Sequence, residues 1–275
     1  MKRILVPVDF SEEAKCAVRT AANIARKTGS DIYLLHMVDL PEGIIDAQSG
    51  TDNSSPASIL YMQKIHERFD EIKNSPELEG LNVSEKVHFE KTFNGVIEES
   101  KKDNIDLIVM GSSGATGLKE IIVGSNTEKV VRHSKVPVLV VKKDAGDLDI
   151  KHIVFASDFG DESKNRFQDV IDFVKIFDAT LHLLYVNTPH NFNTTKDINE
   201  KISNFVDDFT LDKFDINIYD DISVEKGILN FANDIDADLI ALNTHGRSGL
   251  SQLFNGSVGQ ELANHALKPV LTFKI

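Results

Sequence analysis

Short apolar runs alternate along the chain with segments in which apolar residues recur every three or four positions. Runs of this kind are typical of buried strands, and the longer spacing is typical of amphipathic helices. In the first part of the chain the expected strands are Arg3–Val8, Ile32–Val38, Val83–Phe89, Ile105–Met110 and Pro137–Lys142. The helices between them are expected from Ser11 to Lys27, from Pro56 past Ile72, from Gly95 to Lys102 and from Ser125 to His133.

The same alternation starts again after a polar segment, Asp144–Asp149. The expected strands are now Ile153–Ala156, Leu181–Val186, Phe214–Tyr219, Leu239–Leu242 and Val270–Lys274, with a helix ending near Phe177 and others near Lys196–Phe209 and Val224–Asn233. Strands that alternate with helices imply βαβ crossovers and a parallel sheet covered by helices on both faces. The stretch IDLIVMGSSG from Ile105 also has a counterpart, ADLIALNTHG from Ala237.

This repeat predicts two tandem α/β domains, residues 1–145 and 149–275, each with a five-stranded parallel sheet. Asp9 and Asp158 lie 149 positions apart, whereas Gly124 and Gly256 lie 132 apart. The second copy has therefore lost about seventeen residues, which we expect to come from the long polar loop Pro41–Ser58.

Composition limits the classes of protein and partner. A chain of 275 residues with 41% hydrophobic content can bury a sizeable core. The net charge of -13 divides into -3 for residues 1–145 and -10 for the rest, which argues against nucleic acid as a partner. No run is long enough to cross a membrane and the start does not look like a signal peptide, so we expect a cytoplasmic protein. The single cysteine, Cys16, is expected to pack in a helix.

Three predicted strands end at residues suited to a ligand: Asp9, Val38 and Gly111. Ligands of open parallel sheets bind beyond the carboxyl ends of the strands. Gly111 and Gly114 would let the backbone approach a ligand closely, and Gly124–Ser125 opens a helix whose free N–H groups attract phosphate. Each feature also has a structural explanation: Ser125 and Glu128 form a capping box, Asp9 could hold a loop, and Gly114 could serve a turn. Their convergence at one sheet edge favours a ligand site in the first copy.

Several other motifs are absent from the sequence. It contains neither the phosphate loop of P-loop NTPases nor the dinucleotide-binding glycine pattern after the first strand. It also lacks the G-x-S-x-G of serine hydrolases, and its histidines show no pairing that would build a nucleophile with its base.

The chain resembles the universal stress protein family in tandem form. The family pattern G-x2-G-x9-G-[ST] is matched by Gly111, Gly114, Gly124 and Ser125, and the flanks ILVPVDFS and TEKVVRHSKVPVLVV are typical of the family. The resemblance covers nearly the whole chain. It implies a Rossmann-like fold related to other adenine-nucleotide-binding α/β domains (the adenine nucleotide alpha hydrolase-like class), and a role in stress response.

The resemblance also implies an ATP site in the first copy, with Mg²⁺ on the phosphates. Asp9 would meet the ribose, Val38 the adenine, and Met110 and Gly111 the sugar and phosphates. The implied ligand residues are Pro7, Val8, Asp9, Val38, Met110, Gly111, Gly114, Gly124, Ser125 and Asn126. The second copy keeps a weaker set: Asp158, Val186, Gly246, Arg247, Gly256 and Ser257, with Asn243 in place of the first glycine.

Two functions fit these observations. The first is an ATP-binding regulator whose loop conformation changes its association with a partner or with a second copy of the chain. The second is a nucleotide-independent scaffold that acts through sheet edges; here Val136–Val141 and Pro269–Phe273 would be edge strands that pair the two halves within one chain. Slow ATP hydrolysis has no support in the sequence, because no general base or water-positioning residue can be named, so a binding protein is favoured over an enzyme.

Overall fold

The computed structural model describes residues 1–38, 56–89, 92–112, 125–142, 149–244 and 268–275. Its strands are β1 (Arg3–Pro7), β2 (Asp31–Met37), β3 (Val83–His88), β4 (Leu107–Gly111), β5 (Val138–Val141), β6 (His152–Ala156), β7 (Thr180–Asn187), β8 (Phe214–Asp220), β9 (Leu239–Thr244) and β10 (Val270–Lys274). Its helices are α1 (Glu12–Thr28), α2 (Pro56–Lys73), α3 (Thr92–Lys102), α4 (Ser125–His133), α5 (Asp161–Lys164), α6 (Phe167–Phe177), α7 (Thr195–Val206) and α8 (Val224–Asp234), with a 3-10 turn, η2, at Pro76–Leu78.

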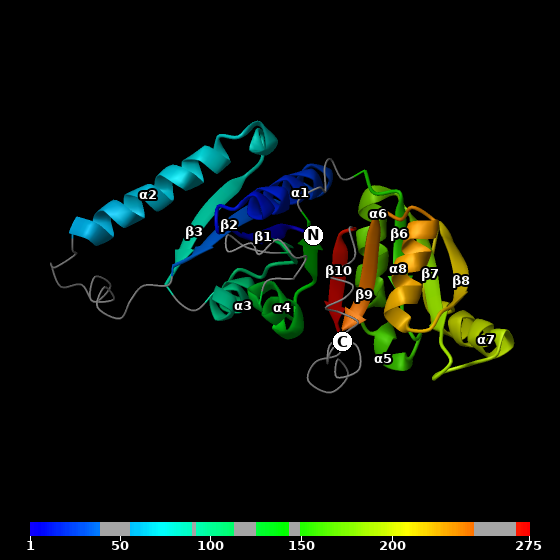
Figure 1. Cartoon of the computed structure of the whole chain (residues 1–275). Coiled ribbons are helices and arrows are strands. Elements are labelled where there is room, and N and C mark those ends of the chain that lie inside the picture. Colours follow the sequence, from blue (N-terminus) through cyan, green and yellow to red (C-terminus); the bar gives the residue numbers. More distant parts are fainter. Residues whose placement is uncertain (39–55, 90–91, 113–124, 143–148, 245–267) are drawn as a thin grey trace.

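All the strands belong to one sheet of ten, in the order β3-β2-β1-β4-β5-β10-β9-β6-β7-β8 (Figure 1). The neighbours are parallel except where β5 meets β10. Within each half the strand order reverses beside the first strand, between β1 and β4 and again between β6 and β9. The predicted α/β fold with parallel strands is therefore confirmed, but the two five-stranded sheets are joined into one.

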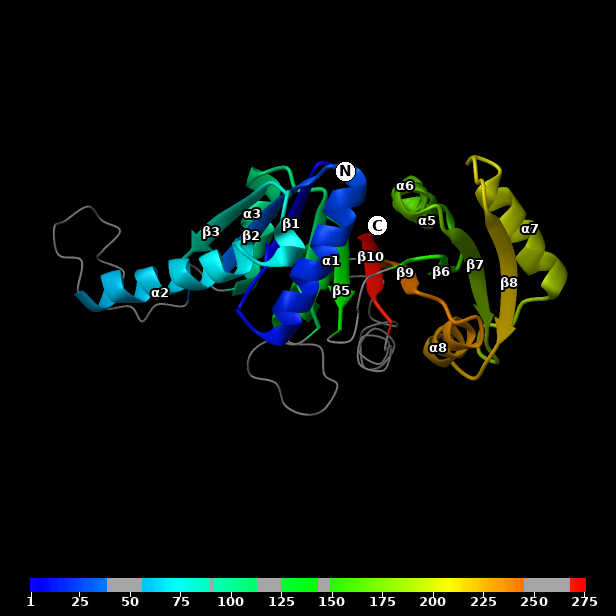
Figure 2. The same ribbon diagram turned by 90° about the horizontal axis from the view of Figure 1, so that it is seen from above.

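The junction between the halves is the antiparallel pair β5–β10, which lies in the middle of the sheet in Figure 2. Leu139 pairs with Leu271, and both side chains are fully buried. The hydroxyl of Thr272 donates to the Val138 carbonyl at 3.2 Å. The two fifth strands, expected to be edge strands that pair the halves within one chain, do pair with each other, so the outer strands of the joined sheet are β3 and β8.

Helices cover both faces of the sheet. Helices α1, α2, α6 and α7 pack on one face over a core cluster that continues from the first half into the second. The other face carries two separate clusters, one beneath α3 and α4 and one beneath α8. Cys16 is fully buried in the shared cluster, as predicted for a packing residue. One continuous core thus ties the two halves together on a single face.

Local sequence signals fix both ends of α1. The Ser11 hydroxyl accepts from the Ala14 N–H and caps α1, and Gly29 ends the helix in the left-handed conformation. The left-handed residues recur in both halves at matching places: Phe10 and Phe159, Gly29 and Asp178, Asn104 and Asp236. One expectation fails here. The single helix expected up to Phe177 is broken into α5 and α6, because Arg166 leaves the helical conformation.

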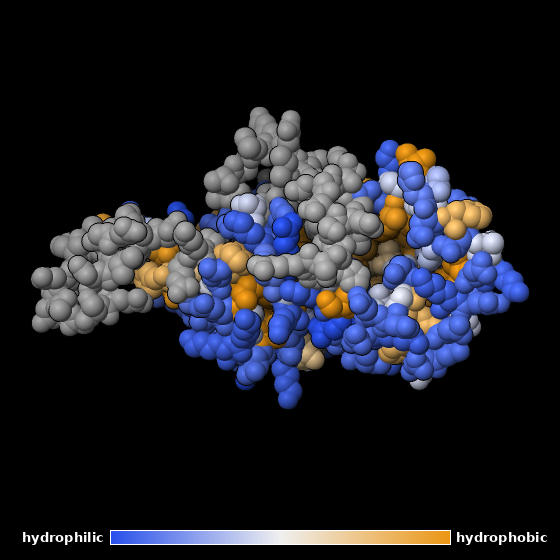
Figure 3. Space-filling view, turned by 90° about the horizontal axis from the view of Figure 1, so that it is seen from below, coloured by the Kyte–Doolittle hydropathy of each residue, from blue (hydrophilic) through white to orange (hydrophobic). Residues whose placement is uncertain are grey.

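Among the described residues, no helix is long and apolar enough to cross a membrane. On the face shown in Figure 3, the coloured residues are mostly hydrophilic, with small separate groups of hydrophobic residues.

Candidate functional site

The carboxyl end of β1 places Asp9 at the surface, beside the point where the strand order reverses. Pro7 ends the strand half-buried, and Val8 is buried with its N–H donating to the Leu35 carbonyl at 2.8 Å. The Asp9 carboxylate accepts from the Ser11 N–H at 3.0 Å and from the Ser11 hydroxyl at 2.5 Å. Asp9 therefore holds the loop that starts α1, as its structural explanation required, while its side chain stays exposed to solvent.

The residue after this aspartate has an unusual backbone. Phe10 has φ 64°, in the left-handed region that bulky residues rarely adopt. Its ring packs against His36, with the ring centres 4.5 Å apart, and against Phe69 of α2 at 5.5 Å. The Arg68 guanidinium lies 5.3 Å from the centre of the same ring. These contacts tie the strained turn next to Asp9 to β2 and α2, and backbone strain of this kind gathers at functional sites.

The end of β2 supplies the second wall of the site. Val38 is almost fully buried, and its N–H donates to the His88 carbonyl at 2.9 Å. His36 Nδ1 lies 2.7 Å from the Val8 carbonyl oxygen, which can only accept, so this nitrogen carries a proton. Burial lowers the pKa of His36 below 6.5, and Arg68 adds to this, although the Val8 carbonyl and Asp9 oppose it. The neutral imidazole thus links the ends of β1 and β2.

The shifted pKa of His36 predicts a pH dependence of stability. Because its pKa is lower in the folded state, the unfolded chain binds more protons at mildly acidic pH, and stability falls as pH drops below about 6.5. This contribution has a slope of at most about 1.4 kcal/mol per pH unit. We expect His36→Gln to flatten the decline between pH 7.5 and 5 in urea unfolding. The control His190→Gln, at an exposed histidine of the loop after β7, should leave the decline unchanged, and equal declines in wild type and His36→Gln would contradict the prediction.

Gly111, at the end of β4, is required by the packing of α1. A Cβ atom at this position would lie 2.9 Å from both the Cβ and the backbone oxygen of Glu13. The sequence predicted that this glycine lets the backbone approach a ligand, but the close approach seen here is to the first turn of α1. The Gly111 carbonyl also accepts from the Thr127 hydroxyl of α4 at 3.0 Å. Met110, just before it, is buried.

The phosphate-binding part of the predicted site is only partly described. Gly114 and Gly124 lie outside the described residues, whereas Ser125 and Asn126 are exposed in the first turn of α4, which begins where the sequence predicted. Glu128, the expected second member of the capping box, forms an ion pair with Arg132 at 2.9 Å. Lys142 follows β5 at the same sheet edge, and burial lowers its pKa to about 8.

The second half brings different residues to the equivalent edge. Asp158 is exposed like Asp9, and its carboxylate accepts from the Gly160 N–H at 3.0 Å. The strand register corrects one assignment, because Val186 corresponds to Met37, and Asn187 occupies the place of Val38. Asn187 is buried, and its amide donates to Asp220 at 2.9 Å. The other predicted residues lie outside the described ranges: Gly246, Arg247, Gly256 and Ser257.

Asn243 takes the place of Gly111, and the helix beside it is the one that breaks. Its amide nitrogen donates to the Ser163 carbonyl in α5 at 3.2 Å, while its buried Oδ1 has no hydrogen-bond partner among the described residues. In the first half, α1 passes through the space that a side chain at position 111 would fill. The side chain of Asn243 fills the equivalent space, and α5 ends there after one turn. The two edges therefore differ in backbone as well as in side chains.

Sequence reasoning missed three residues of the first edge: Phe10, His36 and Lys142. A repeat signal was present for two of them, because Asp-Phe occurs at both strand ends and a lysine lies at the end of the fifth strand in both copies, at Lys142 and Lys274. His36 gave no such signal, since Tyr185 occupies its place in the second half.

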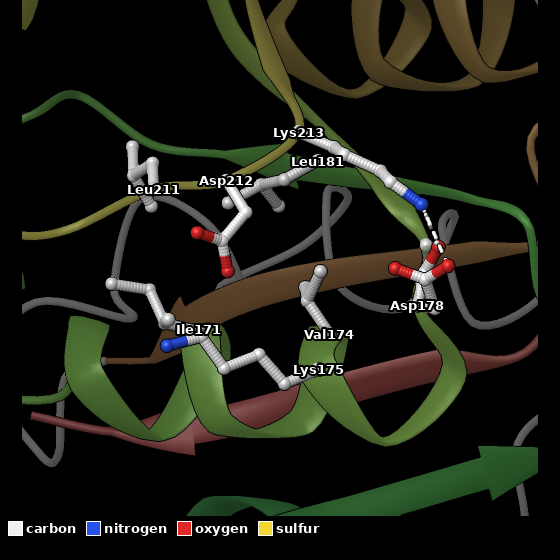
Figure 4. Close-up of a pocket in the computed structure, with 9 residues that line it drawn as sticks. Ile171, Val174, Lys175, Asp178, Leu181, Leu211, Asp212 and Lys213 are labelled. Carbon is white, nitrogen blue, oxygen red and sulfur yellow. Dashed lines mark hydrogen bonds and ion pairs between the residues drawn. The ribbon is translucent and has the colours of Figure 1, made fainter.

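A pocket lies at the opposite edge of the second half, at the amino end of β7 (Figure 4). Lys213 reaches across its rim to Asp178, with Nζ 2.6 Å from the carboxylate. Its lining residues are Ile171, Val174, Lys175, Asp178, Ala179, Leu181, Leu211, Asp212 and Lys213. Because ligands of open parallel sheets bind at the carboxyl edge, this pocket is not assigned to the candidate site.

In the described parts of the chain, no group of three or more His, Cys, Asp or Glu side chains is placed to hold a metal ion.

The fold is that of an α/β protein, and its candidate ligand site lies where the strand order of the parallel sheet reverses. The sequence pattern of the Universal stress protein family matches residues 1–142 and 217–274, and the chain belongs to this family. The unmatched stretch 143–216 includes β6, α5, α6, β7 and α7.

Similar proteins agree with this membership. The universal stress protein MJ0531 of Methanocaldococcus jannaschii is 32% identical over 143 residues, which cover 52% of this chain and 82% of that protein. MJ0577 of the same organism is 29% identical over 154 residues, with 52% and 95% coverage. The crystal structure of a universal stress protein from Archaeoglobus fulgidus covers 99% of this chain and 98% of its own, with a TM-score of 0.75 and 22% identity. That likeness supports the fold across both halves.

Proposed function

We propose that this chain is an ATP-binding regulator of the universal stress response, with one nucleotide site at the carboxyl edge of the first half. ATP would lie across the ends of β1, β2 and β4. Asp9 would accept from the ribose hydroxyls, Val8, Val38 and Met110 would border the base and sugar, and the start of α4 would meet the phosphates.

One observation carries the proposal: an exposed carboxylate stands at the strand reversal among buried apolar residues of three strands. Val8 is 4% exposed, Val38 1% and Met110 7%, whereas Asp9 is open to solvent. A site with apolar walls and few polar groups is the usual form of a small-molecule site. Ser125 and Asn126 lie on the first turn of α4, where free N–H groups attract an anion.

The protein offers no cage of its own for Mg²⁺ in the described part of the chain. Mg²⁺ commonly keeps several waters and binds through substrate phosphates. We therefore place Mg²⁺ on the phosphates of the bound nucleotide.

The second half acts in this proposal as the structural partner of the first. Two differences support this role: Asn243 replaces Gly111, and the buried polar Asn187 replaces Val38. We take residues 1–145 and 149–275 as two domains that form a dimer-like unit within one chain, supported by the β5–β10 pair and the shared core. A cytoplasmic location and further association between chains stay predictions.

The test is ATP binding to the full chain by isothermal titration calorimetry with Mg²⁺, comparing Asp9→Asn with Asp158→Asn. Asparagine keeps an oxygen that can accept from Ser11, so the loop before α1 should persist. It loses the charge, and a hydrogen bond to a charged group contributes about 1.5–3 kcal/mol. We expect Asp9→Asn to weaken ATP binding by about tenfold or more, and Asp158→Asn to leave it unchanged.

The same titration can also contradict the proposal. Absence of ATP binding to the wild type, together with no nucleotide in the mass spectrum of gently purified protein, would contradict the proposal. Equal weakening by Asp9→Asn and Asp158→Asn would contradict the assignment of a single site to the first half.

A further inference from the structure

Three side chains form a hydrogen-bonded chain across β6, β7 and β8, far from the candidate nucleotide edge. Asp215 Oδ1 lies 2.8 Å from His182 Nδ1, and His182 Nε2 lies 3.0 Å from His152 Nδ1. They occupy the amino-terminal part of the second half's sheet, on the face covered by α8. His182 is 8% exposed and faces the ring of Phe231, whereas His152 is exposed.

The fold does not require this chain of side chains. In the first half Arg3 and Tyr33 occupy the places of His152 and His182, and Ser84 pairs with Tyr33 as Asp215 pairs with His182. The backbone around the two clusters is nevertheless alike. Asp106 accepts from the Arg3 N–H at 3.0 Å, and Asp238 accepts from the His152 N–H at 2.9 Å. The two histidines are therefore a feature of the second half alone, on a frame that both halves share.

The contact with Asp215 sets the chemistry of His182. A carboxylate only accepts, so Nδ1 of His182 carries its proton and the lone pair of Nε2 points toward His152. A carboxylate behind an imidazole is the usual support of a metal-bound histidine, because it fixes the ring and makes the free nitrogen more basic. Two ring nitrogens 3.0 Å apart form a hydrogen bond, so one of them carries a proton and the other accepts it. Because His182 Nε2 is the acceptor, the proton in the metal-free protein is on His152 Nδ1.

The distance between these nitrogens also suits a metal ion. With metal–nitrogen bonds of about 2.05 Å, two ligands at a right angle lie about 2.9 Å apart, and two tetrahedral ligands about 3.3 Å apart. The observed 3.0 Å is the distance of the hydrogen bond, and a small rotation of the exposed His152 ring would bring the two nitrogens to either value. Imidazole nitrogens suit Cu²⁺ and Ni²⁺, and Cu²⁺ binds a given nitrogen site most tightly among the divalent first-row metals.

Access and charge favour a cation here. His152 is open to solvent, and the side chain of Asp215 is 51% exposed. Asp236 and Asp238 precede β9 on the same side of the sheet, and the field of His152 is among the causes that lower the pKa of the Asp236 carboxyl, after its pairing with Lys268. The whole half from residue 146 carries a formal charge of -10.

We infer that His152 and His182 form a binding site for a divalent transition-metal ion of the Cu²⁺ or Ni²⁺ type. The ion binds His152 Nδ1 and His182 Nε2, and the proton on His152 Nδ1 is exchanged through solvent for one on His152 Nε2, so that both rings stay neutral. Asp215 orients His182 from behind, and water fills the remaining positions. The inference does not depend on nucleotide binding.

The test uses the full chain and the metal salt alone. Titration calorimetry with NiCl2 and with CuCl2 is compared between wild type, His152→Gln and His190→Gln, a matched control at an exposed histidine of the loop after β7. We expect one site in wild type and in His190→Gln, and loss of that site in His152→Gln. Because His152 is exposed, its replacement should leave the fold intact, which the circular dichroism spectrum and urea midpoint check.

Asp215→Asn supplies an independent measurement, since removal of such a supporting group weakens metal binding on the order of 10–100-fold. Copper EPR of the wild type should show coupling to two nitrogens. The inference is overturned if the wild type takes up neither ion, if His152→Gln binds as the wild type does, or if Asp215→Asn leaves the affinity unchanged.

Discussion

Replacing Gly111 by valine is expected to lower the free energy of unfolding by about 3 kcal/mol and to disturb the nucleotide edge. Even a single Cβ atom would lie 2.9 Å from the Glu13 backbone oxygen, and a backbone atom cannot move aside as the end of a flexible side chain can. Overpacking a filled site costs about 1–3 kcal/mol, and valine adds two further methyl groups. The relief available is to shift the start of α1, which carries the Ser11 contacts of Asp9.

Urea unfolding measures the stability loss, and ATP titration measures the effect on the site. Gly111→Ala should give the same effects at smaller size. Asn243→Ala in the second half is the matched control, because residue 243 already has a Cβ atom and α5 ends beside it after one turn. A Gly111→Val protein that unfolds at the wild-type urea concentration would show that α1 is not held by this glycine.

Replacing Leu271 by aspartate is expected to cost more than about 4 kcal/mol, the largest effect among these predictions. Leu271 is fully buried in β10 and pairs with the equally buried Leu139 of β5. An unpaired carboxylate at such a position loses its water and gains no partner, which places the substitution among the most destabilising kinds. Because the core cluster that spans both halves contains Leu139 and Leu271, both halves should lose stability together.

The measurement is urea unfolding followed by intrinsic tyrosine fluorescence and circular dichroism. Thr272→Val is the control at the same junction. It removes the hydroxyl bond to the Val138 carbonyl, a contribution of about 1 kcal/mol, and keeps the strand apolar. Leu271→Asp protein with unchanged stability would mean that the β5–β10 pair does not join the halves.

The sequence predicted where the candidate site lies, but not which contacts its residues make. Asp9, Val38 and Gly111 do gather at one sheet edge, because parallel strands bring their carboxyl ends together. The role of Gly111 was not predictable, since its neighbour Glu13 is distant in sequence and only packing brings α1 against β4. Val186 was assigned in place of Asn187 because the predicted strand ended at Val186, whereas β7 continues to Asn187 and its register gives Asn187 the place of Val38.

What the sequence determined by itself is local or periodic: the alternation of strands and helices, the Ser11 cap and Gly29 stop of α1, and the start of α4 at Ser125. These depend on residues within a turn or two of each other. Only the tertiary structure decided the break between α5 and α6 opposite Asn243, the union of two five-stranded halves through β5 and β10, and the meeting of His152 with His182. Each of these brings together residues far apart in the chain, and their contacts are set by the packing of the whole sheet.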